Sequence, residues 1–79
     1  MPRYYLHLSE CGTITPDVEG GNYPDLRHAR EAAISGAREI MCAELAQGKL
    51  CLGCHVEIAD DAGPVEQIPF RELVTITGL

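Results

Sequence analysis

The chain has 79 residues, 46% of them hydrophobic, and a formal net charge of −6 from six basic and twelve acidic residues. This length is that of one small domain, so we expect a single domain over residues 1–79. The basic residues are scattered, which argues against a nucleic-acid partner because phosphate binding depends on clustered Lys and Arg. No apolar stretch reaches the roughly 18 residues of a membrane span, and no signal peptide is recognised, so we expect a cytoplasmic protein without a membrane partner.

The first expected elements are two strands. Residues 3–9 alternate apolar and polar side chains and are rich in aromatic residues, which predicts a half-buried strand. Residues 10–12 predict a turn, and residues 13–15 predict a short second strand that Pro16 limits. The next stretch, residues 16–25, is rich in Gly, Pro, Asn and Asp and predicts a loop.

A long amphipathic helix is expected from about Leu26 to Gln47. Asp25 is its predicted N-cap, and Gly48 is the predicted left-handed residue that ends it. The polar face of this helix carries Cys42. Residues at helical spacing form the predicted apolar face, which comprises Leu26, Ala29, Ala33, Ala37, Ile40 and Met41, flanked by Ile34 and Leu45.

Two more strands are expected at residues 54–59 and 65–68, joined by a turn at residues 60–64. Residues 69–74 predict a helical turn or an irregular edge, and residues 75–77 are β-prone. The element order β–(β)–α–β–β predicts a two-layer α+β fold. We expect a mainly antiparallel sheet of three or four strands with one long helix on one face.

The segment Cys51-Leu52-Gly53-Cys54-His55 carries most of the chemistry in the sequence. It matches the C-x-x-C-H pattern of covalent haem attachment, but no export signal is recognised and His55 begins a predicted strand. Zinc bound by Cys51, Cys54 and His55 with a fourth ligand is the stronger metal hypothesis. The helical spacing turns Cys42 away from this segment, and the sequence does not place Cys11 relative to it.

Two other interpretations of the same segment stay open. A C-x-x-C dithiol lowers the pKa of its first thiol, but redox motifs of this kind open a helix, whereas this one precedes a predicted strand. Alternatively, Cys54 is a small core residue on the apolar face of its strand, and Cys51 is an ordinary loop residue.

No pairing of a nucleophile with a base is recognised, so we expect a protein that is not an enzyme and holds no cofactor, zinc excepted. A small domain with a helix on one sheet face leaves the other face free for a partner or a second copy. We therefore expect a non-enzymatic protein-interaction module that forms a homo-oligomer. Tyr5 and His7, which share the outer face of the first strand, form the candidate interaction surface.

Several motifs in a fixed order resemble a family of short bacterial proteins of unknown function. The motifs that carry this resemblance along nearly the whole chain are Pro2-Arg3-Tyr4-Tyr5, Asp17-Val18-Glu19-Gly20, Pro24-Asp25-Leu26, Ala37-Arg38-Glu39, Val56-Glu57-Ile58, Asp60-Asp61-Ala62-Gly63 and Ile68-Pro69-Phe70. The family's members open with Pro-Arg-Tyr-Tyr or Pro-Arg-Tyr-Phe, and the resemblance implies no activity. Within residues 51–55 the family pattern keeps only the glycine, here Gly53, so the resemblance implies no role for the cysteines.

The chain is also similar, more distantly, to HicB-type antitoxins. Those proteins likewise place an opening strand and a Pro-Asp-Leu-like segment, here Pro24-Asp25-Leu26, before a helix rich in Ala and Glu. This similarity implies an oligomeric regulator that binds a small toxin protein. The chain lacks the glycine-punctuated second and third strands of those antitoxins.

Overall fold

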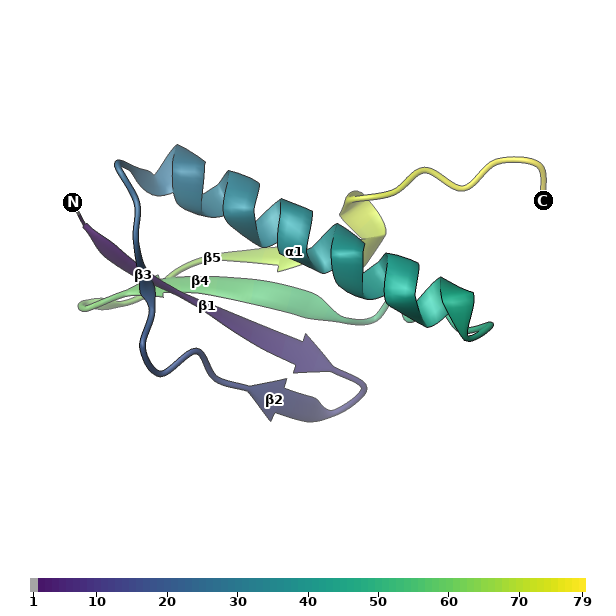
Figure 1. The fold of residues 1–79 in the computed structure, drawn as a ribbon, viewed down its shortest axis with the longest axis horizontal. Helices are drawn as coiled ribbons and strands as arrows, with labels where there is room; N and C mark the ends of the chain where they lie inside the picture. Colours follow the sequence, from purple (N-terminus) through teal and green to yellow (C-terminus); the bar gives the residue numbers. More distant parts are fainter. Residues whose placement is uncertain (1) are drawn as a thin grey trace.

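One long helix lies across one face of an open antiparallel sheet (Figure 1). The computed structural model describes residues 2–79. Its elements in chain order are β1 (Arg3–Glu10), β2 (Thr13–Thr15), β3 (Gly21–Asn22), α1 (Leu26–Ala46), β4 (His55–Asp60), β5 (Gly63–Pro69) and a 3-10 turn, η1 (Phe70–Glu72). The strand order is β2-β1-β4-β5, with β3 also paired to β1, and every pairing is antiparallel.

The expected α+β class, with one helix on one sheet face, is confirmed. The sheet has five strands rather than three or four, because β3 forms within the stretch predicted as a loop. This short strand pairs Asn22 with Arg3 and Gly21 with Tyr4, which lays the chain along the edge of β1 before the helix begins.

Both ends of α1 form as the sequence predicts. The Asp25 carboxylate accepts a hydrogen bond from the backbone N–H of His28 at 2.9 Å, which satisfies one of the free donors of the first turn. Gly48 has a φ of 82°, and its N–H donates to the carbonyl of Leu45 at 2.9 Å. This glycine-ended cap stops the helix at Ala46 and turns the chain sharply back toward the sheet.

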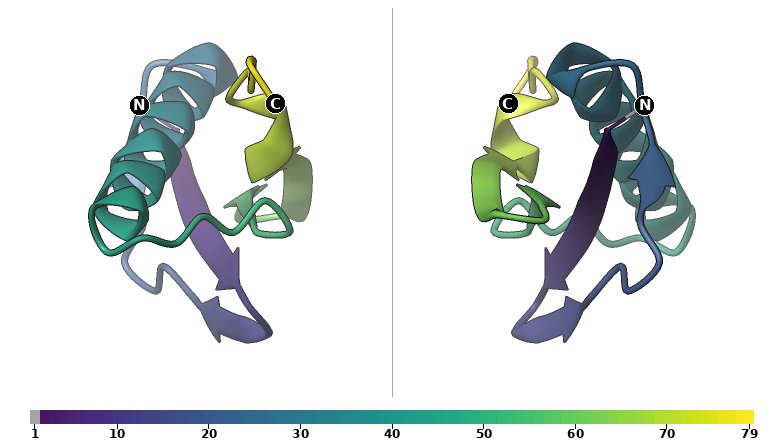
Figure 2. Two further views of the ribbon diagram at one scale, coloured as in Figure 1. Left: turned by 90° about the vertical axis from the view of Figure 1, so that its right-hand side faces the viewer. Right: turned by 90° about the vertical axis from the view of Figure 1, so that its left-hand side faces the viewer.

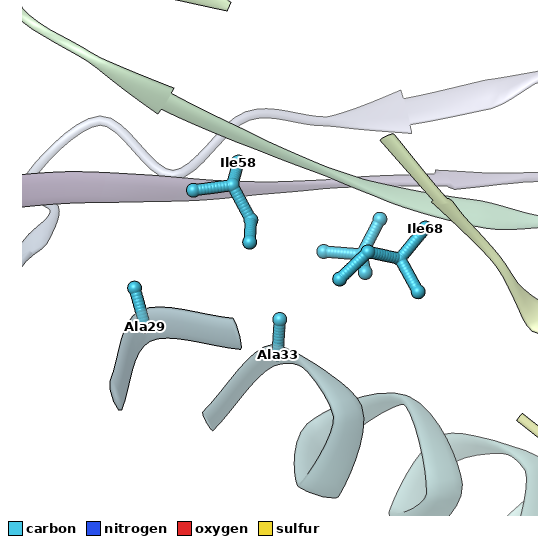
Figure 3. Close-up of a cluster of buried hydrophobic side chains, with 5 residues drawn as sticks. Ala29, Ala33, Ile58 and Ile68 are labelled. Carbon is cyan, nitrogen blue, oxygen red and sulfur yellow. The ribbon is translucent and has the colours of Figure 1, made fainter. Parts of the chain in front are cut away.

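The helix packs on the sheet through its small residues. Ala29 and Ala33 point toward Ile58 and Ile68 of the sheet (Figure 3). Because alanine carries a single methyl group, the helix backbone approaches the sheet closely along this stripe. Leu45, a predicted flank of the apolar face, is 58% exposed, so the buried face ends one turn earlier.

A second group of buried residues fills the space under the other half of the helix. Its members are Ala37, Met41, Cys54 and Phe70, and all four are at most 3% exposed. The 3-10 turn η1 brings Phe70 into this group, and the backbone N–H of Phe70 donates to the carbonyl of Cys54 at 2.9 Å. The start of β4 is thereby fixed between the helix and the C-terminal turn.

The C-terminal residues differ from the prediction in one respect. Residues 75–77 are β-prone but form no strand. The reason is that η1 redirects the chain away from the sheet edge after β5, and the last residues then extend from the body of the molecule (Figures 1 and 2). Within residues 2–79, no helix is both long enough and apolar enough to cross a membrane.

Candidate metal centre

Three cysteine side chains from two segments, the turn between β1 and β2 and the loop between α1 and β4, converge at one end of the sheet. Cys11 lies in the turn between β1 and β2, Cys51 lies in the loop after α1, and Cys54 directly precedes β4. Their three Sγ atoms all lie within 4.8 Å of one another. The Sγ of Cys51 is 2.6 Å from that of Cys54 and 3.4 Å from that of Cys11.

The pairing of β1 with β4 brings these segments together. The two strands are antiparallel, and Ser9 near the end of β1 faces His55 at the start of β4. The turn that follows β1 therefore lies beside the residue that precedes β4. Since the helix also ends at this end of the molecule (Figure 1), the loop that carries Cys51 passes the same point.

Glu44 and the hydrophobic core hold two of the thiols in place. The Glu44 carboxylate, in the last turn of α1, accepts a hydrogen bond from the backbone N–H of Cys51 at 3.2 Å. Cys54 is 2% exposed and packs among the residues of the second core group. Cys51 is half-buried and Cys11 is exposed, so the cluster is anchored inside the protein and open toward solvent.

The turn that carries Cys11 has an unusual backbone. Only Cys11 and Gly12 connect the paired residues Glu10 and Thr13, and their φ angles are 46° and 83°. Two successive positive φ angles define a type I′ turn, which favours Asn-Gly and is unfavourable for other side chains at the first position. A cysteine held in the left-handed region at the cluster is the kind of local strain that concentrates at functional sites.

The pKa values of the three thiols shift in different directions. Hydrogen bonds from the thiols of Cys54 and Cys11, and from the backbone N–H of Gly53, lower the pKa of Cys51. Burial raises the pKa of Cys54 to about 12, and the hydrogen bond to Cys51 raises the pKa of Cys11. Cys51 is thus the thiol of the cluster that loses its proton most readily, and a bound metal ion would favour loss of the other two protons as well.

The separations of the three sulfur atoms suit a small thiophilic cation. Zinc–sulfur bonds of about 2.3 Å in a tetrahedron place two sulfur ligands about 3.8 Å apart. The three sulfurs lie between 2.6 Å and 4.8 Å apart, so small rotations of the side chains reach this spacing. On the solvent side the cluster borders a hollow of about 500 Å³ lined also by Glu10, Glu44 and Lys49. A fourth ligand would enter from this hollow.

Of the three metal ligands that the sequence predicts, the structure brings two together. Cys51 and Cys54 are neighbours, but His55 is not part of the group. Successive residues of a strand point to opposite faces, so His55 lies on the face away from the helix with His7 and Glu57. Cys11 takes the place that sequence reasoning gave to His55.

Cys42 lies where the helical spacing placed it. It is exposed on the outer face of α1, where it borders Arg38 and Glu39. A signal for Cys11 was present in the sequence: Cys11-Gly12 is a two-residue turn, and antiparallel pairing of the strands on either side brings it to Cys54. Recognising this required the strand order, which the sequence did not supply.

The candidate interaction residues Tyr5 and His7 have partners within the chain. Their rings stack with centroids 6.2 Å apart and an interplanar angle of 6°. The Tyr5 hydroxyl donates to Asp61 at 3.1 Å, and Nδ1 of His7 accepts from the backbone N–H of Asp17 at 3.0 Å. Both side chains are half-buried. The bond of His7 holds the loop before β3 against β1, and the bond of Tyr5 reaches the turn between β4 and β5.

Comparison with known proteins places the chain in a family. The model of a domain of unknown function (DUF6894) matches residues 3–71. The chain belongs to the DUF6894 family. The matched region contains all three clustered cysteines, and the description of DUF6894 names no activity. No curated protein and no solved structure matches the chain. The comparisons show no link to HicB-type antitoxins.

Replacing Cys11 with Asn separates the effect of this residue on the stability of the turn from its effect on metal binding. Asn is favoured at the first position of a type I′ turn, so Cys11→Asn should raise the melting temperature of the metal-free protein by a few degrees. The same change should weaken metal binding by roughly 100-fold or more, because it removes a ligand. Differential scanning calorimetry and competitive chelator titration measure the two effects. If Cys11→Asn instead lowered the melting temperature of the metal-free protein, the backbone of Cys11 would not be strained.

Proposed function

We propose that this DUF6894 protein binds one thiophilic metal ion, zinc in the first instance, through Cys11, Cys51 and Cys54. The observation that carries the proposal is the convergence of three sulfur atoms from segments 40 residues apart in the chain. Zinc prefers thiolate and imidazole ligands, and three protein ligands with one open position are a common arrangement for zinc that exchanges its fourth ligand. The proposed role is binding and not catalysis.

The position of the cluster supports a stabilising role for the ion. A domain of this size gains only modest stability from its core, and small domains often add a metal. An ion at this point would join the β1–β2 turn to the loop after α1 and to the start of β4. The binding free energy would then contribute directly to the free energy of folding.

Packing alone accounts for one of the three thiols. A free cysteine behaves as a small hydrophobic residue, which fits the buried Cys54. It does not fit Cys11, which is exposed and adopts a backbone conformation that a cysteine disfavours. The position of Cys11 beside Cys51 therefore favours a site over a coincidence of packing.

Metal analysis tests the proposal directly. Protein purified without an affinity tag or chelator should hold about one zinc per chain, and a chelator should lower its melting temperature. Single substitutions Cys11→Ser, Cys51→Ser and Cys54→Ser should each reduce the bound metal severalfold. Inductively coupled plasma mass spectrometry and thermal unfolding supply the two measurements.

Two control substitutions sharpen this test. Cys42→Ser removes an exposed thiol far from the cluster, and His55→Ala removes the ligand that the sequence pattern offered. Both variants should hold as much zinc as the unsubstituted protein. Less than about 0.1 metal per chain in the unsubstituted protein, or metal loss in His55→Ala alone, would contradict the proposed ligand set.

A second candidate function is self-association, supported by an apolar groove between α1 and β1. The groove has a volume of about 130 Å³, and its lining includes Leu6, Leu8, Ala32, Gly36 and Ile40. A Cβ atom added at Gly36 would meet no other atom within 4 Å, so the glycine leaves the groove open. We propose that a second copy of the chain occupies it.

The C-terminal residues supply the complementary apolar surface. They extend from the body of the molecule (Figure 1), with Ile76 47% exposed and Leu79 fully exposed. Residues 74–79 carry no charged side chain. The lining of the groove includes none of these residues, so we propose that the segment of one copy fills the groove of another.

Light scattering after size-exclusion chromatography tests self-association. We expect a dimer or larger species at micromolar to millimolar concentration, and Gly36→Glu should convert it to a monomer by placing a charge in the groove. Ser35→Glu adds the same charge on the exposed face of the helix and should leave the assembly intact. A monomer at every concentration would rule out this function.

A further inference from the structure

The three sulfur atoms form a compact group in which Cys51 is in contact with both of the others. Its Sγ lies 2.6 Å from that of Cys54 and 3.4 Å from that of Cys11. A reaction that begins at Cys51 therefore finds a second thiol already beside it. We propose that the metal-free cluster is also a thiol–disulfide exchange site for small disulfide molecules, with Cys51 as the attacking thiol and Cys54 as the resolving thiol.

Access to the cluster supports these roles. Cys51 borders the hollow of about 500 Å³ at the surface, together with Cys11 and Lys49. A small disulfide can therefore approach Cys51 from solvent. Cys54 is 2% exposed and packs among the second core group, so Cys51 is the more accessible of the two thiols to a molecule in solution.

The proposed exchange has two steps. The Cys51 thiolate attacks one sulfur of the small disulfide, forms a mixed disulfide and releases the first thiolate product. The Cys54 thiol then gives its proton to water and attacks the sulfur of Cys51, which forms the Cys51–Cys54 disulfide and releases the second thiolate. The protein loses two electrons and two protons, and the small disulfide gains both to become two thiols.

Proximity decides which thiol completes the exchange. Cys54 is the nearer neighbour of Cys51, and its position in the core fixes it there. An oriented intramolecular attack is far faster than attack by a second molecule from solution. The sulfur of Cys11 lies farther from that of Cys51, at 3.4 Å, and Cys11 remains a free thiol at the exposed turn after the Cys51–Cys54 disulfide has formed.

Cys42 provides a reference within the same molecule. It is exposed on the outer face of α1, and it is not part of the cluster. A small disulfide can react with Cys42, but the product must remain a mixed disulfide because no neighbouring thiol resolves it. The difference between the glutathione ratios at which Cys42 and Cys51 react thus measures the effect of the cluster.

The experiment equilibrates chelator-treated, unsubstituted protein with mixtures of reduced and oxidised glutathione. Acid quenching and peptide mass spectrometry then identify the linked cysteines. We expect a Cys51–Cys54 disulfide without bound glutathione, formed at a ratio of oxidised to reduced glutathione at least about tenfold lower than that which modifies Cys42. In Cys54→Ser, glutathione should remain on Cys51 or be displaced by Cys11.

Three outcomes would overturn the proposal: glutathione retained on Cys51 in the unsubstituted protein, a Cys11–Cys51 disulfide as the main product, or reaction of Cys42 and Cys51 at the same glutathione ratio. The unsubstituted protein decides the question, so poor folding of a variant does not affect it. The reaction is run without metal, and its failure therefore leaves the metal-binding proposal intact.

Discussion

The antiparallel pairing of β1 with β4 is the interaction on which the remaining structure depends. It places Leu6 beside Ile58 and Leu8 beside Val56, which gives the helix an apolar surface to cover. The same pairing fixes the end of β1 next to the start of β4. The thiol cluster is a consequence, since the turn after one strand and the residue before the other meet at this end of the sheet. A one-residue shift in register would turn the apolar side chains of β1 away from the helix and would displace the Cys11 turn.

Much of the fold was predictable because it rests on local patterns. Alternation defined the strands around Leu6 and Ile58, and helical spacing with Asp25 and Gly48 defined α1 to within one residue. The short strand β3 was missed because it has only two residues and is held by pairing with β1 alone. The β-prone residues near Ile76 form no strand because burial of Phe70 in the turn before them directs the chain away from the sheet. In both cases, tertiary contacts outweighed local preference.

The site was predictable only in part for a related reason. Cys51 and Cys54 are three residues apart in the sequence and neighbours in space, so their spacing alone identified them. His55 follows Cys54 directly, yet the pleat of β4 turns it to the opposite face of the sheet. Cys11 joins the cluster through strand pairing across 40 residues, which no short motif records. The cluster therefore combines a local motif with a distant residue. Only the distant residue, Cys11, distinguishes a candidate site from two neighbouring cysteines.

The central claim is that three sulfur atoms bind one metal ion. Zinc K-edge X-ray absorption of the zinc-loaded protein tests it most directly, because the method reports the number and type of atoms bound to the ion. The account predicts three sulfur ligands at about 2.3 Å and one oxygen or nitrogen ligand at about 2.0–2.2 Å. Two sulfur ligands with an imidazole, or a shell of oxygen and nitrogen alone, would contradict it.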